Sequence, residues 1–127
     1  MSKSTITIPW TTLIAKSGTE VFLPATPWIG SQGIRQLRAV SEIRGIEGNL
    51  EVGIAYQVAN VYDEPGADHG ISTGHQAVGY NYPSGWTDPT TDLADKLLIR
   101  FGLRVRVHTG SDTAWGRVAA SIQIVSE

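Results

Sequence analysis

The sequence predicts an all-β fold, an antiparallel β-sandwich or jelly-roll-like protein with seven to eight strands and at most one short helical segment. In the segment Leu97–Val107, apolar residues occupy every odd position, while three arginines stand among the even ones. Because successive side chains on a strand point to opposite faces, this segment is a strand with one apolar face and one arginine-rich face. The 127-residue chain also has 14 glycines and six prolines, which is typical of strands joined by turns rather than of a helical bundle.

Seven segments have the composition or alternation expected of strands. In chain order they are Thr5–Trp10, Glu20–Leu23, Arg35–Arg44, Leu50–Val58, Gln76–Tyr82, Lys96–His108 and Arg117–Val125. Trp10 continues the alternating apolar face of the first segment, so we expect it in the core. Leu50–Val58 alternates as cleanly as Leu97–Val107, which predicts that their apolar faces pack together.

Turn residues separate these segments, notably at Lys16–Thr19, Glu47–Asn49 and Thr109–Thr113. The last turn is short and polar, which predicts a hairpin of the final two strands. Asp88–Asp95 is the best helical candidate, because Asp88 can cap and Pro89 suits a first helical position. We predict a single β-sandwich domain over residues 1–127, with residues 1–4 as a flexible N-terminal arm.

Composition excludes several classes of function. With no cysteine, the chain has no disulfide, thiolate zinc site or cysteine nucleophile. Ten basic and twelve acidic residues give a net charge of −2, which does not attract nucleic acid. No apolar run serves as a signal peptide or approaches the roughly 20 residues of a membrane span. We therefore expect no nucleic-acid partner, no membrane association and synthesis in the cytoplasm.

The arginine-rich face is the first candidate site. Arg100, Arg104 and Arg106 share this face, and Arg38 from another strand is expected to join them. One interpretation is a contact surface for a protein partner or a phosphate, since guanidinium groups make forked contacts with both. The other is cross-strand pairing with carboxylates such as Glu42 and Glu51.

A loop rich in aspartate and histidine is the second candidate. Its potential metal ligands are Asp63, Asp68, His69 and His75. Their spacing matches neither an EF-hand loop nor a recognised zinc motif, so we expect a solvated loop without metal.

Catalytic motifs are also lacking. The chain has no Gly-x-Ser-x-Gly elbow, no phosphate-binding glycine loop and no His-Glu-x-x-His. We therefore predict that the protein is not an enzyme and uses no cofactor.

Aromatic residues outside the predicted core form the third candidate, with Trp28, Trp86 and Tyr82 as its members. Such rings can stack on the C–H faces of a glycan, cover the ends of the sandwich, or lie in a subunit interface. All three interpretations are open at this stage.

Three features of the chain are found together in one group of proteins. A polar start leads directly into Thr5–Ile8, the terminal strand Val118–Val125 runs almost to the last residue, and cysteine is absent. In this the chain resembles the small β-sandwich accessory proteins of tailed-phage virions, which decorate or cement capsids or form parts of tails and fibres. The resemblance implies a virion protein that forms a homo-oligomer, with a trimer as first expectation, on a capsid or tail. The chain is less similar to the jelly-roll carbohydrate-binding modules, which would imply a glycan ligand.

Overall fold

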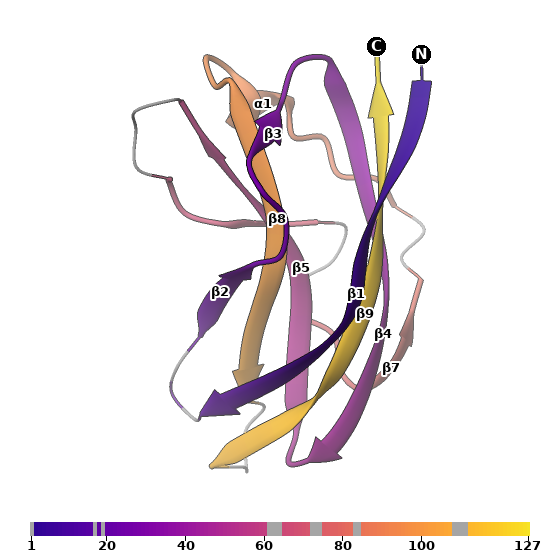
Figure 1. The fold of residues 1–127 in the computed structure, drawn as a ribbon, viewed down its shortest axis with the longest axis vertical. Helices are drawn as coiled ribbons and strands as arrows, with labels where there is room; N and C mark the ends of the chain where they lie inside the picture. The colour runs from indigo at the N-terminus through magenta and orange to yellow at the C-terminus, as the bar shows by residue number, and fades with distance from the viewer. Residues whose placement is uncertain are drawn as a thin grey trace.

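The computed structural model describes residues 2–16, 18, 20–60, 65–71, 75–82, 85–107 and 112–127. Within them the chain forms two antiparallel sheets that pack face to face (Figure 1). One sheet has the strand order β1-β9-β4-β7, and the other has the order β2-β8-β5-β6, with β3 also paired to β8. The predicted antiparallel β-sandwich is confirmed.

The strands differ greatly in length. The first sheet contains β1 (Ser2–Lys16), β4 (Ile34–Glu47), β7 (Gly79–Asn81) and β9 (Thr113–Ser126). The second contains β2 (Val21–Pro24), β3 (Ile29–Gly30), β5 (Leu50–Ala59), β6 (His69–Gly70) and β8 (Leu98–Val107). The described strands number nine rather than seven to eight, because β3 and β6, of two residues each, carry no alternation that the sequence could reveal.

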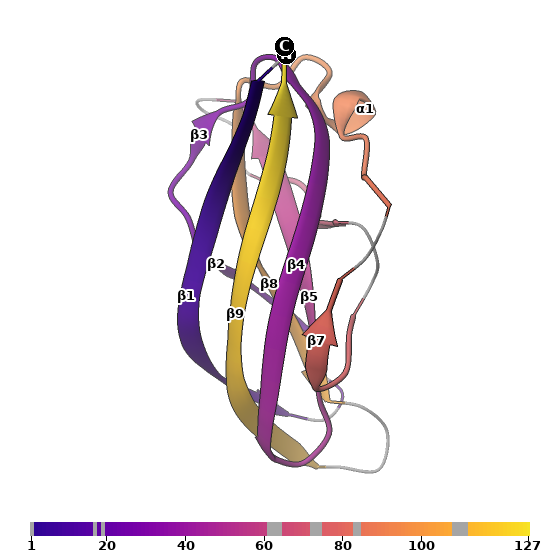
Figure 2. The same cartoon turned by 90° about the vertical axis from the view of Figure 1, so that its right-hand side faces the viewer.

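The helical candidate is a single turn, α1 (Thr90–Leu93), which lies outside the two sheets (Figure 2). Asp88 Oδ1 accepts a hydrogen bond from Thr90 N at 2.9 Å, but Asp88 is not the cap: Pro89, expected as the first helical residue, takes the N-cap position, and no side chain caps the helix. No helix in the described part of the chain is long and apolar enough to cross a membrane.

The core lies between the inner faces of the sheets. The predicted pairing of apolar faces is seen in the register of β5 and β8, where Tyr56 lies opposite Phe101 and Ile54 opposite Leu103. These side chains are buried, because two adjacent strands in register present their inward residues side by side. Leu97 is an exception: it precedes β8 and is 49% exposed.

The N-terminal residues differ from the prediction. Residues 2–4, expected to be a flexible arm, are the first residues of β1, with Ser2 opposite Ser126 in β9. Antiparallel pairing extends to the end of β9, so backbone hydrogen bonding orders this segment.

Trp10 is also not in the core: it is 45% exposed. In the register of β1 and β9, Ile8 lies opposite Ala120 and Thr11 lies opposite Val118, so two residues of β1 face one residue of β9. This β-bulge shifts the alternation of inward and outward side chains. The buried residue before the bulge, Ile8, has an even number and those after it, Leu13 and Ala15, have odd numbers, so the indole of Trp10 faces outward.

The predicted hairpin of the last two strands is wrong. Strand β8 belongs to one sheet and β9 to the other, where β9 lies between β1 and β4 (Figure 2). Strand β9 pairs along its length with two long strands, which satisfies its backbone groups on both edges. A short polar turn does not distinguish a hairpin from a connection between two sheets.

Candidate functional site

The predicted site residues lie on two opposite outer faces of the sandwich. Arg100, Arg104 and Arg106 alternate with buried residues of β8, so they lie on the outer face of the second sheet, where Arg100 covers the ring of Trp28. Arg38 alternates with buried residues of β4 and lies on the outer face of the first sheet, over Trp86. The structure therefore does not bring Arg38 together with the arginines of β8.

Each arginine of β8 has a partner within the chain. Arg100 donates two hydrogen bonds to Gln57 Oε1, at 2.9 and 2.7 Å, and Arg106 Nε donates one to Glu51 Oε1 at 2.8 Å. Gln57 and Glu51 stand directly opposite these arginines on β5. Arg104 forms an ion pair with Asp68 and donates a further hydrogen bond, of 2.6 Å, to the Asp68 carbonyl oxygen. The contacts of Arg100 and Arg106 are thus cross-strand contacts with β5, whereas Arg104 pairs with the residue that precedes β6.

The candidate metal ligands have separate partners. Asp68 is bound by Arg104, while His69 packs on the Tyr56 ring, with centroids 5.2 Å apart, and lies 3.7 Å from Asp92. Asp63 lies outside the described residues. No group of three or more potential ligands occurs in the ranges that the structure describes.

His75 is the most deeply buried of these candidates, with only 7% of its side chain exposed. Its Nε2 lies 3.0 Å from Glu20 Oε1, but this contact does not have the geometry of a hydrogen bond. Burial, together with the positive charge of Arg106, lowers the pKa of His75 below its ordinary value, and the nearby Glu20 opposes this only in part. The neutral imidazole is the form that suits this position.

Tyr56 connects the sheet to the helix. Its buried hydroxyl donates a hydrogen bond to Asp92 Oδ2 in α1 at 2.5 Å. Burial raises the pKa of Tyr56, and the hydrogen bond to Asp92 adds to the effect, so the phenol keeps its proton. This contact fixes α1 against β5.

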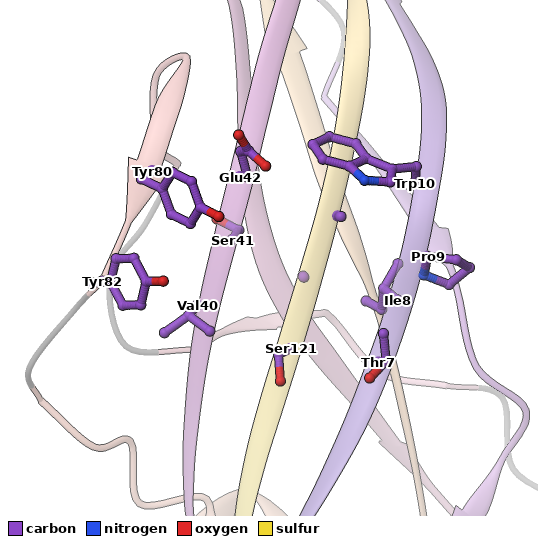
Figure 3. A pocket seen from close by; sticks show the side chains of 12 residues that line it. Thr7, Ile8, Pro9, Trp10, Val40, Ser41, Glu42, Tyr80, Tyr82 and Ser121 are labelled. Carbon is purple, nitrogen blue, oxygen red and sulfur yellow. The ribbon is translucent and has the colours of Figure 1, made fainter.

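A groove of about 420 Å³ crosses the outer face of the first sheet (Figure 3). Trp10 from β1 forms one side, and Tyr80 and Tyr82 form the other. The two tyrosine rings stack, with centroids 5.3 Å apart and planes 8° from parallel, and their hydroxyls point toward β4. They are 66% and 70% exposed. The floor consists of short side chains from three strands, among them Thr7, Val40, Ala119 and Ser121.

Charged groups lie at the groove and beside it. The Glu42 carboxylate lines the groove and accepts hydrogen bonds from Arg44, whose guanidinium lies 4.7 Å from the centre of the Trp10 ring. In the other direction along the strands, a second hollow of about 200 Å³ is lined by Lys3, Arg38 and Trp86. Tyr82 and Trp86 of the predicted aromatic set thus belong to this face, and Trp28 to the opposite one.

Of the three aromatic residues that form the sides of the groove, only Tyr82 was predicted as a contact residue. Trp10 was expected in the core, and Tyr80 was not singled out. A signal was available at Trp10, because a proline inside a strand, here Pro9, marks an edge or a bulge. Nothing in the sequence places Tyr80 beside Trp10, because the two residues come from strands at opposite edges of one sheet.

Comparison with known proteins identifies relatives in fold only. No protein-family model matches the chain, and no curated protein matches its sequence significantly. The structure of the Gt strain of infectious bursal disease virus matches with a TM-score of 0.66 and 10% identity, over 98% of this chain and 33% of that chain. T=1 particles derived from infectious bursal virus match with a TM-score of 0.65 and 10% identity, over 98% and 31%.

The fold is a β-sandwich similar to part of these viral chains. A third viral structure, the VP2 subviral particle of infectious bursal disease virus, agrees, with a TM-score of 0.60 and 10% identity over 98% of this chain and 33% of that chain. This chain spans about a third of the length of the viral chains that it matches.

Proposed function

We propose that the protein is a non-enzymatic structural unit of a virus particle, which acts through contacts with copies of itself and with neighbouring particle proteins. The observation that carries the proposal is the match of 98% of the chain to a part of a particle-forming viral protein. A sandwich with long strands and a large inner core is rigid, and particle proteins need such rigidity to hold defined contact surfaces.

Within the particle, we assign the protein an accessory role. The resemblance to the decoration, cement, tail and fibre proteins of tailed phages supports this role, and localisation in the virion follows from it. We propose a homotrimer as the oligomeric state.

The contact surface that we assign to the oligomer is the side of the sandwich formed by β1 and β2. Both are terminal strands of their sheets, so their outer backbone groups have no neighbouring strand among the described residues. Val21 and Leu23 of β2 are 42% and 39% exposed, although they stand opposite the buried residues Val105 and Leu103. Apolar side chains that face inward at an open side are covered when a second copy packs there.

The oligomer is tested by light scattering of the purified protein, followed by electron microscopy of particles that co-purify with it from the source. We expect a mass of three chains and a specific position on a capsid or tail. Leu23→Glu should dissociate the oligomer, whereas Ile46→Glu, at an exposed apolar residue of β4, should not. A monomer at high micromolar concentration that binds no particle would contradict the proposal.

A glycan platform built from the loop tryptophans has less support. Trp28 and Trp86 lie on opposite faces of the sandwich. The Arg100 guanidinium lies 4.5 Å from the centre of the Trp28 ring, and the Arg38 guanidinium lies 4.4 Å from that of Trp86. The arginines already occupy one face of each ring.

A further inference from the structure

We propose that the outer face of the β1-β9-β4-β7 sheet binds an anionic oligosaccharide. One sugar ring occupies the groove between Trp10 and the tyrosine pair Tyr80 and Tyr82, and an acidic group of the next unit occupies the hollow lined by Arg38 and Lys3. This site does not depend on the particle role proposed above.

The walls of the groove suit a sugar ring. Tyr80 and Tyr82 are 66% and 70% exposed, and their mutual stacking holds both rings beside the groove. Aromatic faces bind the C–H faces of sugars, which are apolar and flat. A volume of about 420 Å³ falls in the range of small-ligand sites, roughly 300–1,000 Å³.

The floor of the groove suits hydroxyl groups. Thr7 and Ser121 present hydroxyls from β1 and β9, and Glu42 presents a carboxylate that is 22% exposed and is held by Arg44. A carboxylate in this position accepts hydrogen bonds from sugar hydroxyls, and it repels a phosphate. It therefore favours a saccharide over a nucleic-acid strand, whose phosphates recur at every unit.

The hollow beside the groove is the reason why we expect the ligand to carry an acidic group. The same three strands line both cavities: β1 with Thr7 and then Thr5, β9 with Ser121 and then Gln123, and β4 with Val40 and then Arg38. Residues two apart on a strand lie about 7 Å from each other on one face, so a ligand of two sugar units can span both cavities.

The charged side chains that the structure describes at the second hollow, Lys3 and Arg38, are both positive. Lys3 and Arg38 form no ion pair with any carboxylate in the described residues; Arg38 donates instead to the neutral Gln123, at 2.8 Å. A guanidinium whose remaining N–H groups are free of carboxylates is suited to bind a carboxylate or a sulfate. This contrasts with the opposite outer face, where Arg104 and Arg106 are paired with carboxylates.

Binding is tested by tryptophan fluorescence and saturation-transfer NMR with four hexamers. The saccharide probes carry an acidic group on alternate sugar units or on none: a keratan hexasaccharide sulfated on its N-acetylglucosamine units, a hyaluronan hexasaccharide (carboxylated) and cellohexaose (neutral). The fourth probe is hexathymidylate (a single DNA strand). We expect at least one acidic saccharide to bind ten times more tightly or better than cellohexaose, and hexathymidylate not to bind.

Variants locate the site. Tyr80→Ala should weaken binding of the acidic saccharide at least tenfold, and Arg38→Gln should remove most of its advantage over cellohexaose. Trp28→Ala and Arg106→Gln, which change an aromatic residue and an arginine on the opposite face, should leave binding unchanged. Thermal melts verify that all four variants are folded.

Three results would overturn the proposal. The first is that no saccharide binds at millimolar concentration, and the second is that cellohexaose binds as tightly as both acidic probes. The third is that hexathymidylate binds and that Tyr80→Ala abolishes this binding. The last result would assign the face to nucleic acid instead.

Discussion

The ion pair between Arg104 and Asp68 joins two parts of the protein that the sequence presents as separate sites. Arg104 belongs to the arginine-rich face of β8, and Asp68 lies immediately before β6, in the loop rich in aspartate and histidine. Their side chains are 21% and 28% exposed, so the pair is partly protected from solvent. The pair holds Asp68, the residue before β6, against the outer face of the second sheet.

We expect Arg104→Ala and Asp68→Ala each to lower the free energy of unfolding by about 1.5–3 kcal/mol, the usual value of a partly buried charged hydrogen bond. The double variant should lose less than the sum, because either change removes the same contact. Urea denaturation of the four proteins gives the coupling energy. As a control, Arg106→Ala removes a more exposed pair and should cost less than about 1 kcal/mol. Additive losses would show that the pair has no structural role.

The assignment of the core is tested at Phe101, which is fully buried opposite Tyr56. Truncation to alanine removes most of the ring contacts and leaves a cavity, so we expect a loss of about 3–5 kcal/mol in chemical denaturation. Leu97→Ala, at the half-exposed residue before β8, should cost less than about 1 kcal/mol. Similar losses for the two variants would contradict the division into inner and outer positions.

The β-bulge in β1 predicts opposite outcomes for two apolar residues of one segment. Ile8→Ala should lower stability by about 2–5 kcal/mol, because Ile8 is buried between the sheets. Trp10→Ala should lower it by less than about 1.5 kcal/mol, because the indole lies on the surface and loses mainly its contact with Arg44. Thermal and urea melts measure both. A larger loss for Trp10→Ala would place the indole in the core, as simple alternation predicts.

Stability should fall as the pH decreases from 7.5 to 5.5, with a contribution from His75. The pKa of His75 is lowered in the folded protein, so the unfolded chain binds a proton more readily, and stability rises with pH. The groups that face His75 are Glu20, Glu51, Arg104 and Arg106. His75→Gln should therefore reduce the loss of unfolding free energy over this pH range.

The control for this measurement is Gln76→Ala, at the next residue in the chain, which has no titratable group. We expect it to keep the pH dependence of the wild type. If His75→Gln has the same slope as the wild type, then protonation of His75 does not contribute to acid sensitivity.

The sequence predicted the sandwich and much of its core because both depend on a local property. Alternation with period two identifies the inner face of a strand from that strand alone, as for Phe101 in β8 and Ile122 in β9, which are both buried. The same rule identified the arginine-rich outer face of β8, where Arg100, Arg104 and Arg106 alternate with buried residues.

The sequence did not predict which strands are neighbours. The separation of β8 and β9 into different sheets depends on the partners that β9 finds far away in the chain, β1 and β4. Strand alternation is the same whichever strand lies alongside, so it contains no information about this choice.

The sequence by itself thus determined that the chain is an antiparallel sandwich and which side of most strands is apolar. Only the tertiary structure decided that Trp10 faces outward across from Tyr80, that Arg38 and Lys3 share a hollow, and that Arg104 is paired with Asp68. The physical reason is that side-chain alternation is set within each strand, whereas a surface site is formed where strands distant in sequence are brought together by backbone pairing and core burial.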